Sequence, residues 1–493
     1  MLKNKIMKHY KILLFLPLLL LINSCTKDLN PVDYSEINPN IFPKSASDLD
    51  AMVNAAYYPL RGAWFDGIFS TSERGVMFLS DATTEILHGK YGDQQTASLQ
   101  NYKSSDGLFT RYYDDFYNKI SSMTITIDLI QRSTVSEELK KKAVAQVRCA
   151  RGLLAYTLFD LYGPLVIAPL DILKNPLKEA PLARLSNAEM IAFIEADLEA
   201  AAIDLPMPQD GEYGRFNKAL AKIINIRLQL HEKKWAKVKT LCDEIIAFNA
   251  YSLDADYAAM WDLDGAKNSH EVIWAIPCDY AGTSENQWQL MVLPAVYAPK
   301  GGFGTITSTW WFYDRFEAAD KRKQMLITQF TGTDGITYNR SSPGGILDWG
   351  PIALKMNPDA NRTTGLSTVD IVMYRYADVL LSKAEAIANA GTPNAEAMEL
   401  VNVVRRRAGL ADKLLSNYSS LTAFNDLILL ERSHEFWCEN GQYRADLIRH
   451  GKFITRCQEV HASTFTGPNK VVYPFSLKAV SEGKGKFIQN PGY

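Results

Sequence analysis

Apolar side chains recur every three or four residues in several stretches of this chain, which is the spacing of one face of an α-helix. Residues 371–407 show the pattern most plainly, with two such faces: Ala377, Leu381, Ala384 and Ala388, then Ala397, Leu400, Val401 and Val404. Gly391 and Pro393 stand between the two faces, where one helix can end and another begin. The pattern therefore predicts two helices that pack closely against each other through small side chains.

The same spacing predicts helices over residues 48–60, 112–131, 136–161, 187–203, 218–230, 235–248 and 421–439. Pairs of helices with short joins resemble tetratricopeptide-type units, which cannot bury their apolar faces alone and therefore stack. The pairs occur at irregular intervals, so we expect large insertions between them. The predicted fold class is mainly α.

Two long sections, residues 64–108 and 251–369, lack the helical spacing. The second contains one alternating run, residues 272–276, which predicts a strand with one buried face. Both sections combine aromatic residues with many glycine, serine, threonine and aspartate residues. Their aromatic content disfavours disorder, and long ordered loops are commonly functional.

The N-terminus has the pattern of an exported protein. Four lysines precede an apolar run over residues 12–22, which is shorter than the roughly 20 residues that span a bilayer. We therefore predict a signal peptide over residues 1–24. The residues before Cys25 resemble a bacterial lipobox, which implies lipidation of Cys25; plain secretion with a free Cys25 thiol is the alternative. Residues 25–47 are predicted to be a tether, and residues 48–493 a single domain.

The charge and cysteine content exclude several kinds of site. The formal net charge of −2 becomes about −6 when the four lysines of the signal peptide are removed, which disfavours nucleic-acid binding. The other cysteines form no CxxC pair, so we expect buried free thiols, while a disulfide stays open. Glu431 and Glu435 lie one helical turn apart with His434 between them, which could suggest acid–base or metal chemistry. No further ligand follows at a recognisable spacing, so neither a metal nor a cofactor is predicted.

Five ordered motifs resemble those of the SusD/RagB family, over residues 147–170, 375–386, 401–409, 429–452 and 489–493. The resemblance implies a non-enzymatic nutrient-binding lipoprotein of the outer membrane that faces the cell exterior. It also implies one mainly helical domain with tetratricopeptide-like pairs and a loop-rich ligand-binding half. The implied partners are a SusC-like TonB-dependent transporter and an oligosaccharide or, in some branches, a peptide.

A sugar site needs exposed aromatic planes beside polar groups that fix orientation. The resemblance implies that ligand contacts come from residues 64–102 and 280–311. The candidate ligand residues are Tyr91, Trp288, Trp310 and Trp311, with Trp64, Gln94 and Asn101 behind them. Of the adjacent Trp310 and Trp311, one is expected to pack inward and the other to face solvent. The alternative for each aromatic side chain is a place in the core.

The charged residues of the motifs are expected to form structural ion pairs rather than ligand contacts: Arg375, Asp378, Glu385, Glu431, Arg432, Glu435, Arg444 and Asp446. Two other functional classes stay open. A helical scaffold that binds only protein would leave the tryptophan-rich loops without a purpose. A glycoside hydrolase would need two carboxylates across a bound sugar, and nothing in the sequence singles out such a pair.

Overall fold

The computed structural model describes residues 42–493 except 176, 178–179, 280–283, 343–344, 358 and 360–365. The predicted signal peptide, Cys25 and the tether as far as residue 41 lie outside the described residues. Within the described part, no helix combines the length and the apolar character needed to cross a membrane.

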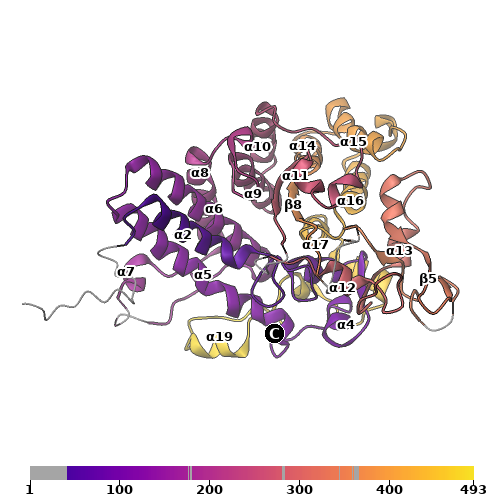
Figure 1. Ribbon diagram of the computed structural model, residues 1–493, viewed down its shortest axis with the longest axis horizontal. Coiled ribbons are helices and arrows are strands. Elements are labelled where there is room, and N and C mark those ends of the chain that lie inside the picture. The colour runs from indigo at the N-terminus through magenta and orange to yellow at the C-terminus, as the bar shows by residue number, and fades with distance from the viewer. Residues whose placement is uncertain are drawn as a thin grey trace, which may run out of the picture.

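Long helices form one half of the molecule and continue as a layer along its upper side (Figure 1). They are α2 (Ala46–Tyr57), α5 (Gly107–Arg132), α6 (Glu137–Tyr162), α8 (Asn187–Asp204), α9 (Lys218–His231), α10 (Trp235–Ala247), α14 (Tyr376–Ala390), α15 (Ala395–Arg407) and α16 (Leu421–Phe436). Helix α6 packs against α5 and α8, α9 against α8 and α10, and α14 against α10, α15 and α16. This stacking of neighbouring pairs confirms the mainly α class.

The two helices predicted within residues 371–407 are confirmed, but the predicted start of the first helix is wrong. The eight face residues listed above pack in or against a small core between α14, α15 and α16. Asn394 caps α15 by accepting a hydrogen bond from the backbone N–H of Ala397 at 2.9 Å. Residues 371–375, however, form a strand, β8 (Ile371–Arg375), that pairs with β2 (Val272–Ile276). The helix begins only at Tyr376.

Strand β2 is buried along nearly its whole length, so the prediction of one buried face is wrong. Ile273, Trp274, Ala275 and Ile276 are all buried. The reason is the position of the β2–β8 pair, because both of its strands pack into the main core.

The loop-rich half consists of short helices and paired strands. They are α3 (Val76–Ala82), β1 (Leu87–Gly89), α4 (Gly92–Ser98), α11 (Gly265–Asn268), α12 (Trp288–Val292), β3 (Ile306–Ser308), α13 (Trp310–Tyr313), β4 (Leu326–Ile327), β5 (Gln329–Thr331), β6 (Thr337–Asn339), β7 (Ile352–Ala353), α17 (Gln442–Arg449), α18 (Phe453–His461) and α19 (Leu477–Glu482). The short helix α7 (Leu170–Leu173) lies instead beside α5 in the helical half (Figure 1). Strand β1 pairs with β3, with His88 opposite Thr307. This pair brings together the two sections in which ligand residues were predicted.

The eight charged motif residues form buried ion pairs, as predicted. Arg375, which is almost fully buried, contacts Glu271 and Glu435 at 2.6 Å and Glu439 at 2.7 Å. The other motif residues are paired with Arg227, Arg322, Arg405, Arg449, Asp160 and one another. Burial alone would raise the pKa of Glu435, but Arg407, Arg375 and Arg322 hold it well below its usual range. These contacts tie β8 and α15 to α16 in a charged interior.

The cysteines within the described part carry free thiols. Cys149, Cys242, Cys438 and Cys457 are buried, and Cys278 is half-buried. The prediction of buried free thiols is confirmed for four of the five.

Candidate functional site

The paired strands β1 and β3 end at a surface that presents Tyr91 and Gln94. The backbone N–H of Lys90 donates to the carbonyl of Thr305 at 2.9 Å, which extends the pairing by one residue. Gln94, in the first turn of α4, donates to the Thr305 hydroxyl at 3.3 Å. Tyr91 stands at the N-terminus of α4 with 66% of its surface exposed. The structure therefore leaves Tyr91 accessible and fixes Gln94 beside it.

A tryptophan that the sequence reasoning did not select lies against the same strand. Trp349 is 49% exposed, and its ring stacks on His88 with centroids 3.9 Å apart and planes 17° apart. His88 is only 2% exposed, and neither of its ring nitrogens has a hydrogen-bond partner within the described residues. Burial, then His461 and Lys90, lower the pKa of His88 to about 3. A neutral imidazole thus supports one face of Trp349.

A second group of exposed rings lies where the loop after α2 meets the glycine-rich turn before β3. Phe65 is 61% exposed and Phe303 is 57% exposed. Half-buried Trp64 lies between them, with ring centroids 6.0 Å from Phe65 and 6.3 Å from Phe303. Arg74 contacts the Phe65 ring from 4.9 Å. We call Trp64, Phe65, Tyr91, Phe303 and Trp349 the aromatic surface.

Phe303 and Gln94 belong to one continuous region, because Thr305, two residues after Phe303, holds Gln94 and Lys90. Lys90 also reaches the carbonyl of Ile346 at 3.0 Å, in the loop that carries Trp349. Hydrogen bonds of Lys90 and Gln94 therefore connect the segments that carry Tyr91, Phe303 and Trp349. The signal that sequence reasoning passed over was the position of Phe303 and Trp349 beside glycines in turns.

Two of the selected tryptophans cannot offer a ring face to a ligand in this structure. Trp288 has no exposed surface, and its indole N–H donates to the carbonyl of Ala353 at 2.8 Å. Trp310 is also buried, and its indole N–H donates to Leu347 at 2.8 Å. Both fill the core of the loop-rich half, since large apolar rings gain most from burial. The proposed roles of Trp288 and Trp310 as exposed platforms are therefore corrected.

The remaining candidates are partly accessible. Trp311 is half-buried, so of the adjacent pair Trp310 packs inward and Trp311 retains exposed surface, in line with the prediction. The Arg315 guanidinium lies 2.9 Å from the centroid of the Trp311 ring. Asn101 is half-buried beside the end of α4, where its backbone N–H donates to Thr96 at 3.0 Å. The structure does not bring Asn101 into contact with the exposed rings.

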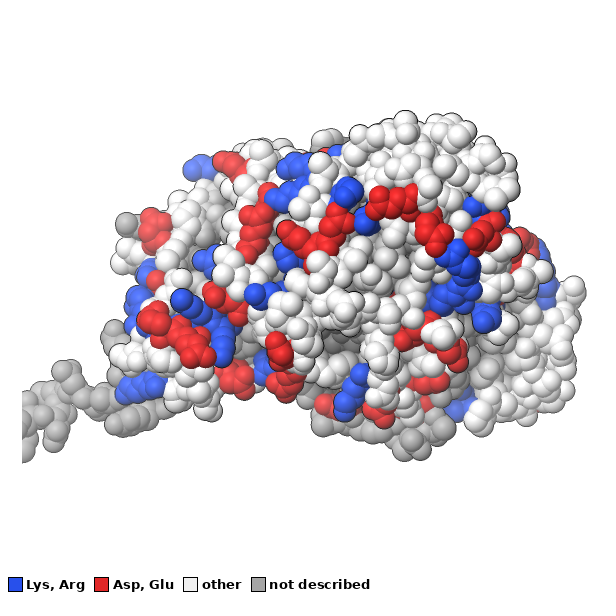
Figure 2. Space-filling view, turned by 90° about the horizontal axis from the view of Figure 1, so that it is seen from above, with Lys and Arg blue, Asp and Glu red and all other residues white. Residues whose placement is uncertain are grey.

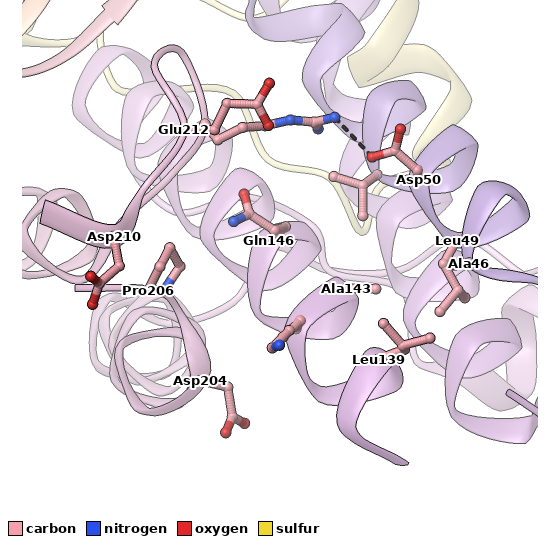
Figure 3. Close-up of a pocket in the computed structure, with 13 residues that line it drawn as sticks. Ala46, Leu49, Asp50, Leu139, Ala143, Gln146, Asp204, Pro206, Asp210 and Glu212 are labelled. Carbon is pink, nitrogen blue, oxygen red and sulfur yellow. Dashed lines mark hydrogen bonds and ion pairs between the residues drawn. The ribbon is translucent and has the colours of Figure 1, made fainter. Parts of the chain in front are cut away.

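A groove on the helical half is a second concave region (Figure 3). It has a volume of about 460 Å³ and lies between α2, α6 and the segment after α8. Its floor is apolar, with Leu49, Leu139 and Ala143, and an ion pair of 2.8 Å joins Asp50 to Arg215 across it. Its lining residues include no aromatic ring. It therefore lacks the flat platform that a sugar needs.

Neither a basic surface for nucleic acid, on the face shown in Figure 2, nor a metal site is seen among the described residues. Acidic and basic side chains are interspersed over the face seen from above, without a continuous basic field (Figure 2). Within the described part, no group of three or more His, Cys, Asp or Glu side chains is placed to hold a metal ion. Glu431 and Glu435 are bound by arginines, and the His434 ring stacks on Phe316 at 3.8 Å. Glu431 and Glu435 are therefore members of structural ion pairs.

Two family models match this chain. One, described as the SusD family, matches residues 335–493, and the other, described as "Starch-binding associating with outer membrane", matches residues 39–228. Starch-binding protein SusD of Bacteroides thetaiotaomicron is 24% identical over 405 residues, covering 68% of this chain and 69% of the relative. SusD-like protein P25 of Formosa agariphila is 23% identical, covering 96% and 95%.

Solved structures share the mainly helical fold of this chain. Surface glycan-binding protein A from Bacteroides thetaiotaomicron, in complex with laminarihexaose, superposes with a TM-score of 0.74 at 19% identity, over 90% of this chain and 99% of that one. A SusD homologue from the same organism superposes with a TM-score of 0.77 at 17% identity, over 93% and 99%. At this level of identity the likeness establishes the fold.

Proposed function

Because this chain belongs to the SusD/RagB family, we propose that it is a non-enzymatic glycan-binding lipoprotein of the outer membrane. It captures oligosaccharide at the cell surface and delivers it to a SusC-like TonB-dependent transporter. The observation that carries the proposal is the exposed ring of Trp349, which is supported from beneath by the neutral ring of His88. Two relatives whose names state starch or glycan binding support the same class of ligand.

The aromatic surface suits a chain of sugar units. Sugar rings have flat C–H faces that pack on aromatic planes, while their hydroxyls need polar partners at the edges. Tyr91 and Trp349 provide exposed rings, and Gln94, Lys90 and Arg74 provide donors nearby. Several rings in separate places fit an extended ligand better than a single small molecule.

Binding without turnover is part of the proposal. Hydrolysis of a glycosidic bond needs two carboxyl groups on either side of it. The buried carboxylates of the motif region are engaged by arginines. The purified protein incubated with candidate glycans should therefore release no shorter products, as followed by chromatography. Turnover that persists after repurification would contradict the proposal.

The arrangement of the two halves is consistent with an outward-facing site. Helices α2, α5 and α7 lie at one end of the long axis, and α13 and β5 lie at the other (Figure 1). The described chain enters at residue 42, just before α2. With lipidated Cys25 as the anchor, the loop-rich end extends away from the membrane. Metabolic labelling with a fatty acid should label the wild-type chain and not Cys25→Ala.

The binding site is tested by calorimetry on neutral oligosaccharides, with a peptide panel to examine the alternative ligand class. For a glycan that binds, Trp349→Ala should weaken affinity about tenfold or more, because a central aromatic contact contributes over about 1 kcal/mol. Ile203→Ala is the control, since Ile203 is an exposed apolar residue on α8, outside the aromatic surface. Equal affinities of both variants and the wild type would place the site elsewhere. Co-purification of a SusC-like transporter from outer-membrane extracts tests the partner.

A further inference from the structure

A charged pocket lies beside Trp311, between α13, α16 and α18. Its volume is about 630 Å³, and its walls include Trp311 and Tyr443, the cations Arg315, Lys452 and Arg456, and the carboxylates of Glu85, Asp426 and Glu459. Arg315 lies 2.9 Å and Arg456 4.5 Å from the centroid of the Trp311 ring. Two guanidinium groups therefore meet at one indole at the wall of a cavity large enough for a sugar unit.

The two arginines differ in their acidic partners. Arg456 contacts Glu85 and Glu459, each at 3.3 Å. Within the described residues Arg315 has no carboxylate at ion-pair distance, and it donates only to the backbone carbonyl of Trp311 at 3.0 Å. Burial and then the charge of Arg456 lower the pKa of Arg315. An anion placed between the two guanidiniums would offset this repulsion.

The pocket wall also contains buried polar atoms without a protein partner. Within the described part, Oε2 of Glu85 and Nε2 of His434 have no hydrogen-bond partner, and both residues line the pocket while being almost fully buried. The Tyr443 hydroxyl donates to the other oxygen of Glu85 at 2.7 Å. Burial raises the pKa of Glu85, which reduces its repulsion of an anion. Unpaired buried groups of this kind favour a ligand with hydroxyls, because each one costs free energy when left unsatisfied.

The pocket adjoins the aromatic surface. The backbone N–H of Trp310, next to Trp311, donates to the carbonyl of Trp349 at 3.1 Å. Glu85 and His88 are three residues apart, across the start of β1. The segments that carry Trp349 and the pocket therefore adjoin each other.

We propose that this pocket binds the carboxylate or sulfate group of an acidic sugar, so that the ligand of this protein is an anionic glycan. This inference rests on the proposed function and adds the chemical class of the ligand. Arg315 and Arg456, both held beside the Trp311 ring, contact the anionic group, and Glu85 and His434 receive hydroxyls of the same sugar.

The test is calorimetry on the intact soluble domain with three probes of equal length. These are oligogalacturonate for carboxylate, a sulfated galactan oligosaccharide for sulfate, and laminari-oligosaccharide as the neutral probe. We expect one acidic probe to bind at least tenfold more tightly than the neutral probe, and the two acidic arms to identify the group. Arg315→Gln should weaken the acidic probe about tenfold, the loss of one charge-assisted contact, and leave the neutral probe unchanged.

Two further variants make the result decisive. Arg456→Lys keeps the charge but loses the planar fork and should weaken only the acidic probe. Arg132→Gln, at an exposed ion pair on α5, is the control and should change neither. Equal binding of acidic and neutral probes overturns the inference and leaves glycan binding intact. An acidic preference that survives Arg315→Gln also overturns it, and binding of no glycan overturns both proposals.

Discussion

Replacement of His88 separates two roles that the structure gives this side chain. Its ring supports Trp349 from beneath at 3.9 Å, and its imidazole is held neutral inside the protein. His88→Phe retains a flat ring but has no titratable proton, whereas His88→Ala removes the ring as well. The two variants therefore test separately the stacking of the His88 ring on Trp349 and the effect of its buried, neutral imidazole on stability.

The magnitude of the pH effect follows from the depressed pKa of His88. The unfolded chain binds a proton below its ordinary value of 6.5, whereas the folded protein stays neutral down to about 3. The contribution of His88 to the free energy of unfolding is therefore fully present above pH 6.5, the pKa in the unfolded chain. It decreases as the pH falls from 6.5 toward about 3, because only the unfolded chain takes up the proton in that range. Between about pH 7 and about pH 5 the loss amounts to about 2 kcal/mol in the free energy of unfolding.

Urea unfolding at several pH values measures this loss directly. The wild type should lose about 2 kcal/mol more than His88→Phe between about pH 7 and about pH 5, because the other titrating groups cancel in the comparison. In calorimetry on a glycan that binds, His88→Ala should weaken affinity about two- to tenfold through the lost stacking, and His88→Phe should restore it. A pH dependence of His88→Phe identical to that of the wild type would refute the reasoning.

Two further predictions concern the charged interior. Lys355 is fully buried and donates to the carbonyls of Glu435 and Trp437 and to Glu439 at 3.0, 2.7 and 2.6 Å, so Lys355→Met should lower the free energy of unfolding by about 3 kcal/mol in urea. An unchanged unfolding midpoint would contradict this. Glu435→Gln removes the charge that faces Arg375 and Arg407 and should cost about 3 kcal/mol or more, against less than about 0.5 kcal/mol for Asp115→Asn at an exposed pair.

The helical half could be predicted because its signal is local. In α14 and α15, small apolar residues repeat at helical spacing, and such a face must be covered by another helix. The strand at residues 371–375 could not be predicted this way, because it depends on pairing with β2, which lies far earlier in the chain. Local spacing contains no information about that partner.

The same limit applies to the candidate site. Tyr91 is an accessible ring, as predicted, whereas Trp288 and Trp310 are buried. All three residues stand in sections rich in glycine, serine and threonine, so the neighbouring residue types do not distinguish them. Whether an indole packs inward depends on the carbonyls and side chains that surround it in three dimensions. Trp349 was passed over because its support comes from His88 on a distant strand. The aromatic sections over residues 64–108 and 251–369 contain both core rings and exposed rings, and composition does not distinguish the two.

The charged residues that make the motifs recognisable serve mainly the scaffold. A buried network such as that of Arg375 and Glu435 tolerates few changes, because removal of one partner leaves an uncompensated charge inside the protein. Such a network produces long, ordered motifs whatever ligand is bound. An exposed ring such as Tyr91 or Phe303 can change with little effect on folding. The charged motif residues thus identify the scaffold, whereas the ligand proposed above would be selected by the exposed rings and by the pocket beside Trp311.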